Sequence, residues 1–304
     1  MDLTNLNSQF SIQEKATNLA FCPGKGDIPW LEIKNKAAAA TISLQGAHLL
    51  SWIPVGQQDV IWVSEQARFA VGKSVRGGIP ICWPWFGAHA GERNYPAHGF
   101  ARTVQWQVTE TKCLSEDETQ ITFQLQTDQL EQVIQQMWPW PTRVEYRVTI
   151  SKILKLELIT TNLSEDTISI GQATHTYFAV DDIKQTSVTG LDDKTYLDKP
   201  DNFKRKIQSG PIQFESEVDR IYINTAEAVT IDDHKRQIHI SKQGSQSTVV
   251  WNPWHDVALK MGDLGLNGYR KMLCVESANA AEDTVQILPG DSHRLQVCYT
   301  VEAL

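Results

Sequence analysis

Short segments in which apolar and polar residues alternate recur along this chain, and they limit its fold more than any other feature. A period of two places the apolar side chains on one face of a strand, which can then be buried. Two segments show the pattern most clearly, one with Val144, Tyr146, Val148 and Ile150, the other with Leu295, Val297, Tyr299 and Val301. Turn-forming residues separate such segments, and no strand–helix–strand alternation is visible. The pattern predicts an all-β protein, with large antiparallel sheets packed as a sandwich.

The predicted strands cover most of the chain after its first residues. We expect them at 30–35, 41–54, 59–64, 103–114, 118–127, 143–151, 153–164, 168–180, 220–231, 236–242, 247–254, 273–280 and 294–303. One short helix is predicted over 128–137, capped by Asp128 and stopped by the prolines that follow it. We expect a single domain over residues 1–304, in which the polar residues 1–20 pack loosely.

Composition and charge narrow the possible partners. The formal net charge of −8 argues against general binding to nucleic acid or an anionic membrane, so an anionic ligand needs a local basic pocket. The N-terminal residues lack the pattern of a secretory signal, and no apolar run approaches the ~20 residues of a membrane span. The five cysteines are scattered and form no CxxC, which fits a reducing cytosol. We expect a cytoplasmic monomer that binds no metal ion.

The segment 74–102, SVRGGIPICWPWFGAHAGERNYPAHGFAR, is too rich in glycine, proline and aromatic residues for a regular strand or helix. Arg76 and Arg102 bracket it, and it also contains His89 and His98. Its aromatic content argues against disorder. Long ordered loops in compact domains are usually functional, so this segment is a candidate for ligand binding.

Common enzyme motifs are missing from the sequence. GxSxG, GxxxxGK[ST], HExxH and a GxGxxG after a strand are all absent, so the hydrolase, P-loop, zinc-peptidase and dinucleotide interpretations have no support. What remains is two polar residues in apolar, strand-like runs, His175 in QATHTYF and Glu276 in LCVESAN. Burying a carboxylate is costly unless it is paired or used, and desolvation raises its pKa toward that of a general base. From the residues alone, a structural ion pair for Glu276 and a hydrogen-bonded core histidine for His175 remain open.

Five segments in order connect these residues to a known family. SVRGGIPICWPWFG, AHGFARTVQW, THTYFAV, GLDDKTYLD and CVESANA closely resemble the hexose-6-phosphate mutarotases (glucose-6-phosphate 1-epimerases), a branch of the aldose 1-epimerase family. The resemblance runs from about residue 25 to 300. It implies the galactose-mutarotase-like β-sandwich and the interconversion of α and β anomers of a hexose 6-phosphate, glucose 6-phosphate foremost.

The resemblance also implies roles for six residues. His175 in THTYF and Glu276 in CVE are similar to the family's catalytic pair. Substrate contacts are implied for four others: Arg76 in RGGIP, Arg102 in HGFAR, His98 of the HG motif, and Asp198 in YLD as an acceptor for sugar hydroxyls. Guanidinium forks suit a phosphate.

Two positions depart from the family pattern. Ala97 stands where some relatives carry Gln, and Ser277–Ala278 follow Glu276 where many read Pro-Gly. The first departure can remove a polar contact, and the second can alter the local turn.

Opening a hemiacetal needs a base on the C1 hydroxyl and an acid on the ring oxygen. We expect Glu276 to be the base and protonated His175 the acid, with the roles reversed on closure and no cofactor required. Two other hypotheses remain open: the same chemistry on unphosphorylated aldoses, and a sugar-binding module without turnover.

Overall fold

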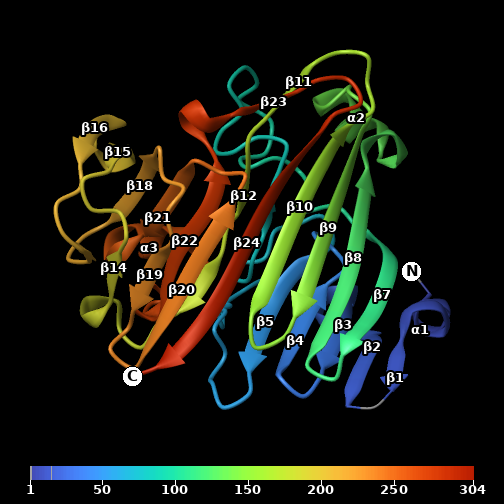
Figure 1. Cartoon of the computed structure of the whole chain (residues 1–304). Helices are drawn as coiled ribbons and strands as arrows, with labels where there is room; N and C mark the ends of the chain where they lie inside the picture. Colours follow the sequence, from blue (N-terminus) through green and yellow to red (C-terminus); the bar gives the residue numbers. More distant parts are fainter. Residues whose placement is uncertain (1, 15) are drawn as a thin grey trace.

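The computed structural model describes residues 2–14 and 16–304, and it confirms the all-β antiparallel class. A nine-stranded and an eight-stranded sheet form the two large layers, with a five-stranded sheet beside them (Figure 1). A two-stranded sheet of β11 (Ile168–Ile170) and β23 (Val285–Ile287) completes the described strands. The main cluster of buried apolar side chains draws residues from Leu6 to Val301, so all three larger sheets share it.

The five-stranded sheet holds the N-terminal part of the chain. Its strands are β1 (Ile12–Glu14), β2 (Thr17–Pro23), β3 (Pro29–Lys34), β4 (Ala38–Ser43) and β5 (His48–Pro54). The predicted strand 41–54 is therefore a hairpin, turned where Gly46 and Ala47 adopt positive φ.

Residues 1–20, which we expect to pack loosely, contain a short helix in the part that the structure describes. Helix α1 (Leu3–Phe10) begins at Asp2, whose carboxylate accepts a hydrogen bond from the Thr4 amide. The Asn7 side chain bonds to both the N–H and the C=O of Phe21, and this ties the helix to β2. Two leucines of this segment are buried, one on the helix and one on β2. The polar composition of this segment did not indicate a helix, and side-chain hydrogen bonds fix the one that forms.

The nine-stranded sheet provides the longest strands. They are β7 (Gln107–Ser115), β8 (Glu118–Gln126), β9 (Thr142–Ile150), β10 (Leu154–Asn162), β14 (Ser187–Thr189), β17 (Ile212–Gln213), β19 (Val229–Asp232), β20 (Arg236–Gln243) and β24 (Ser292–Ala303). The alternating residues that predicted strands 143–151 and 294–303 are fully or nearly fully buried on their apolar face.

The eight-stranded sheet carries the central part of the molecule. Its strands are β6 (Ile81–Cys82), β12 (Gln172–Thr174), β13 (Tyr177–Ala179), β15 (Thr195–Asp198), β16 (Lys204–Ile207), β18 (Val218–Ile223), β21 (Ser247–Asn252) and β22 (Met272–Asn279). The predicted strand 220–231 is wrong as one unit, because β18 and β19 belong to different sheets and Asn224 turns the chain at φ 55° between them.

Helices are few and short. The predicted helix 128–137 begins only at Gln132, because Asp128 lies in a separate 3-10 turn and Glu131 occupies the N-cap. Helix α2 is Gln132–Met137 and helix α3 is Trp254–Met261, where the sequence predicted the end of a strand. The 3-10 turns are Lys25–Asp27, Thr127–Gln129, Ile183–Gln185, Lys199–Asp201, Gly268–Lys271 and Ala281–Asp283. Over the described residues, none of the helices has the length and apolar character to cross a membrane.

The segment 74–102 is irregular, as predicted, and contributes only β6 to a sheet. Trp83 is fully buried and packs its ring against Phe100 and Trp138 at centroid distances of 5.6 and 5.5 Å. Gly99 is required here, since a Cβ would lie 1.9 Å from the Trp83 carbonyl oxygen. The loop is thus fixed from within by its own aromatic residues.

Candidate functional site

The register of the eight-stranded sheet places the candidate residues on one face. Glu276 on β22 lies opposite Val249 on β21, and Trp251, two residues further along β21, lies opposite Asp219 on β18. Paired residues share a face, and so do residues two apart on one strand. Glu276, Trp251 and Asp219 therefore project from the same face of the sheet.

His175 joins this face from the link between β12 and β13. Its amide donates to the Pro80 carbonyl at 3.0 Å, which ties it to the RGGIP segment. Its Nδ1 lies 3.4 Å from Oε1 of Glu276, and the two residues are only 8% and 2% exposed. Among the described residues, neither His175 Nδ1 nor Glu276 Oε2 has a hydrogen-bond partner. Buried polar atoms without partners are rare, and a ligand that enters the site can supply the missing bonds.

Aromatic rings fix the orientation of the His175 imidazole. The Tyr177 ring lies parallel to it, with centroids 4.9 Å apart and an interplanar angle of 8°. Trp251 meets it edge-on at 6.0 Å, and the His98 ring lies 5.5 Å away. His98 therefore lies beside the pair.

Burial moves the two pKa values of the pair in opposite directions. It raises the pKa of Glu276 well above its usual value, and it lowers the pKa of His175 well below. The pKa of His98 falls to about 3, through burial first and the nearby charge of Arg102 second. Burial thus favours the neutral forms of Glu276, His175 and His98.

Arg76 and Arg102 lie near enough to this group that, after burial, the charge of each adds to the lowering of the pKa of His98 and of His175. Arg76 Nε donates to Asp263 Oδ1 at 3.0 Å, and Arg76 Nη1 donates to the Tyr177 hydroxyl at 3.1 Å. Arg102 Nη2 donates to the Ala97 carbonyl at 2.8 Å, so the position that departs from the family pattern still contributes a backbone contact.

A glycine of the RGGIP motif allows the backbone after Arg76 to pack closely against its neighbours. Gly78 has φ 72°, and a Cβ there would lie 2.2 Å from His48 Nε2. His48 is itself buried and lies 2.8 Å from the Gly77 carbonyl. The backbone that follows Arg76 is therefore fixed by contacts that no larger residue permits.

Asp198 is not brought to the pair. It lies opposite Arg220, the residue next to Asp219, and so it belongs to the other face of the sheet. Its Oδ2 lies 2.5 Å from Lys206 Nζ. The carboxylate that does share the face of Glu276 is Asp219, whose charge also raises the pKa of Glu276.

Sequence reasoning missed Asp219, Lys199, Asp263 and Tyr177. Lys199 Nζ lies 2.6 Å from Asp219 Oδ2, and its charge acts on the pKa of both His98 and Glu276. Lys199 begins the charged run 199–206, whose composition is typical of a solvated loop. The mostly apolar strand 218–223 could have marked Asp219, because it is an acidic residue at a buried position of that strand.

The geometry defines a β-sandwich with a buried histidine–carboxylate pair flanked by two arginines. Residues 29–300 match the model of the aldose 1-epimerase family, and the chain belongs to that family. It is an enzyme of the isomerase class, as predicted.

Individual relatives agree with this assignment. The chain is 35% identical over 259 residues to a protein of Escherichia coli (strain K12) named "Putative glucose-6-phosphate 1-epimerase", covering 84% of this chain and 85% of that one. A protein of Cenchrus ciliaris with the same name is 34% identical over 269 residues, covering 84% and 79% of the two chains. A crystal structure from Salmonella typhimurium, described as a "putative mutarotase (YeaD)", superimposes with a TM-score of 0.88 at 30% identity, covering 99% of each chain. The galactose-mutarotase-like sandwich predicted from the sequence is confirmed.

Proposed function

We propose that this enzyme interconverts the α and β anomers of a hexose 6-phosphate, with glucose 6-phosphate as the first candidate. The observation that carries the proposal is the buried contact of 3.4 Å between His175 and Glu276, beside which Arg76 is held by Tyr177, the residue that stacks on His175. The names of the relatives support the same substrate class.

The chemistry needs one base and one acid. In ring opening the base takes the proton of the C1 hydroxyl, the bond from C1 to the ring oxygen breaks, and the acid protonates that oxygen. The aldehyde then rotates about C1–C2 and recloses by the reverse transfers. Protons and electrons balance within the pair and the sugar, and a positioned acid or base typically contributes ~10²–10⁴-fold.

The proton of the pair must move before the predicted roles apply. The sequence hypothesis has Glu276 as base and protonated His175 as acid, whereas burial raises the pKa of Glu276 and lowers the pKa of His175. Burial is the main cause of the low pKa of His175, and the charges of Arg102 and Arg76 make a smaller contribution. A phosphate bound between them cancels this effect, raises the pKa of His175 and favours transfer of the proton from Glu276. Substrate binding thus prepares the pair.

The remaining residues hold the sugar. Arg76 and Arg102 supply guanidinium forks for the phosphate, and His98 faces the hydroxyls. We assign to Asp219 the role of hydroxyl acceptor that the resemblance implied for Asp198, because Asp219 shares the face of Glu276. Asp198 then serves to hold Lys206.

The proposal extends to the setting of the enzyme. We propose a cytoplasmic monomer that acts on a small phosphosugar without a cofactor. The acidic net charge and the five free cysteines support this setting.

Anomer exchange measured by NMR tests the function. Glucose 6-phosphate, glucose and galactose are compared at equal concentration. We expect fast exchange of the phosphosugar alone. Exchange of the free sugars alone would overturn the phosphate assignment and keep the chemistry, whereas binding without exchange of any sugar would indicate a non-catalytic module.

A further inference from the structure

Tyr177 contacts both the acid–base histidine and one of the two arginines of the site. Its ring stacks on the imidazole of His175, and its hydroxyl accepts a hydrogen bond from Arg76. It is 3% exposed and comes from β13, beside the strand that carries Glu276. Among the described residues, Tyr177 is the side chain that contacts both the acid–base histidine and Arg76.

The ring is fixed on three sides. His175 covers one face, Trp62 stacks on it at a centroid distance of 6.1 Å, and Trp251 meets it edge-on at 6.0 Å. Trp251 also meets His175 edge-on at 6.0 Å. A ring with so little freedom fixes the plane of the imidazole, and so it keeps His175 Nδ1 directed at Glu276.

The hydroxyl fixes the guanidinium. Asp263 Oδ1 accepts a hydrogen bond from Arg76 Nε at 3.0 Å, and the Tyr177 oxygen accepts one from Arg76 Nη1 at 3.1 Å. Two of the three guanidinium nitrogens are therefore fixed in place. Burial raises the pKa of Tyr177, against the opposing effect of Arg76, and the hydroxyl stays protonated. A neutral acceptor orients the guanidinium without cancelling the charge that a phosphate requires.

We propose that Tyr177 is a positioning residue that couples the two halves of the site: its hydroxyl aligns Arg76 for the phosphate, and its ring aligns His175 for proton transfer. The hydroxyl part of this inference rests on the proposed phosphate contact of Arg76. The ring part rests on the acid–base role of His175.

Two substitutions separate the two parts. Tyr177→Phe removes the hydroxyl and keeps the stack, so KM for glucose 6-phosphate is expected to rise roughly tenfold with kcat within about twofold. Tyr177→Leu removes both, so the same rise in KM is accompanied by a fall in kcat of about tenfold or more. Equal loss of kcat in both variants, or no change in either variant, would overturn the proposal.

A double-mutant cycle tests the coupling through Arg76. In an Arg76→Ala background, Tyr177→Phe is expected to leave KM unchanged, because the hydroxyl acts through that arginine. Fully additive effects on KM would contradict the coupling. Arg76→Ala alone tests the proposed function separately: if it does not weaken binding of the phosphosugar, the phosphate role fails, and the kcat of Tyr177→Leu still decides the ring part.

Tyr222→Phe is the matched control. Tyr222 is a fully buried tyrosine of the same sheet, and its hydroxyl donates to Gln208 Oε1 at 2.7 Å. It lies opposite Thr248, the neighbour of Val249, and so it faces away from Glu276. The Tyr222 hydroxyl acts only on stability, so Tyr222→Phe is expected to change Tm and to leave kcat and KM unchanged. A matching KM shift in Tyr222→Phe would assign the Tyr177 effect to general destabilisation.

Discussion

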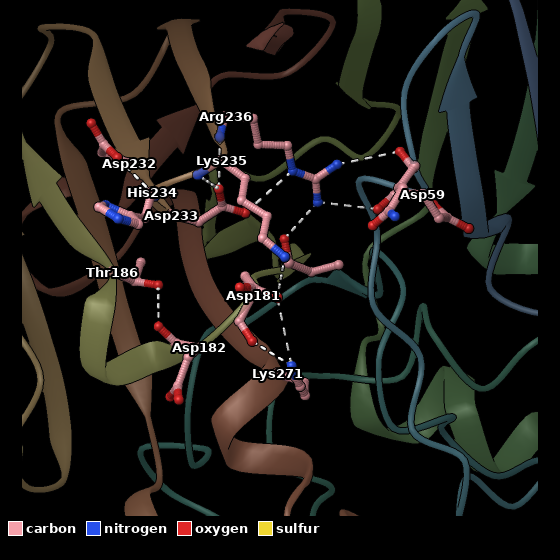
Figure 2. A network of polar contacts seen from close by, with 12 residues as sticks. Asp59, Asp181, Asp182, Thr186, Asp232, Asp233, His234, Lys235, Arg236 and Lys271 are labelled. Carbon is pink, nitrogen blue, oxygen red and sulfur yellow. Dashed lines mark hydrogen bonds and ion pairs between the residues drawn. The ribbon is translucent and has the colours of Figure 1, made fainter. Parts of the chain in front are cut away.

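Two buried groups of ionisable residues in this molecule differ in how completely their polar atoms are bonded. In the first, which we call the Arg236 network, the guanidinium of Arg236 meets Asp233 Oδ2 at 3.3 Å and donates to the carbonyls of Gln58, Asp59 and Ala179 (Figure 2). In the second, the pair of His175 and Glu276, one buried atom of each residue lacks a partner among the described residues.

This difference distinguishes a group that stabilises the fold from a pair that is available for catalysis. The Arg236 network joins the turn before β20 to the end of β13 and to the segment around Asp59, and each polar group of the guanidinium is used in doing so. A fully bonded ion of this kind fixes the fold. An incompletely bonded pair costs stability, and the cost is explained if a substrate completes the bonds.

Glu276→Gln gives the largest expected effect. The amide keeps the shape of the side chain but neither takes nor gives the proton, so exchange of glucose 6-phosphate anomers should fall by about 10³-fold or more. Because burial already favours the neutral form of Glu276, the free energy of unfolding should change little. NMR exchange and denaturant unfolding measure the two quantities. Substantial residual exchange would remove Glu276 from the mechanism.

Arg236→Met should show the opposite pattern. It leaves Asp233 buried without its cation and three carbonyls without donors, which we expect to lower the free energy of unfolding by about 3–5 kcal/mol. The kcat per folded molecule should stay close to that of the parent. Lys235→Met is the control, because Lys235 belongs to the same turn but its side chain is 68% exposed, and a change within about 0.5 kcal/mol is expected. Equal destabilisation by both variants would show that the network does not act through its buried cation.

Arg102→Ala tests the proposed phosphate contact within the site. Arg102 bonds to a backbone carbonyl, and its charge acts on His98, His175 and Glu276. Loss of a charged contact to phosphate should raise KM for glucose 6-phosphate about tenfold to a hundredfold. KM for any free sugar that is turned over should change far less. Equal effects on both kinds of sugar would contradict the phosphate role.

Local sequence pattern was enough to predict the fold class. Alternation in 143–151 and 294–303 identified strands whose apolar face is buried, because this signal depends only on neighbouring residues. Assignment to sheets was out of reach, because it depends on pairing between distant segments. The run 220–231 shows this, since one positive φ at Asn224 sends its two halves into different layers.

The candidate site, like the fold, could be predicted only in part from the sequence. His175, Glu276, Arg76, His98 and Arg102 could be named from motifs, and the structure brings them to one region. The face of Asp198 could not be read from YLD, because it is set by the register of β15 on β18. Asp263 was invisible for a similar reason, since its contact with Arg76 spans 187 positions of the chain.

The smallest expected effect concerns His48, a buried histidine that is well bonded yet titratable. Burial lowers its pKa to about 4, from an ordinary value of 6.5. As the pH falls below 6.5 the unfolded chain takes up this proton first, so stability is lost progressively until the folded protein protonates near pH 4. At pH 5.5 the loss attributable to His48 is about 1 kcal/mol relative to pH 7.

His175 and His98 act in the same direction and Glu276 in the opposite one, so the difference between the parent and His48→Gln isolates the contribution of His48 to the acid loss. Unfolding curves at pH 7 and pH 5.5 should show a smaller acid loss in the variant, whereas identical losses would mean that protonation of His48 is not coupled to unfolding.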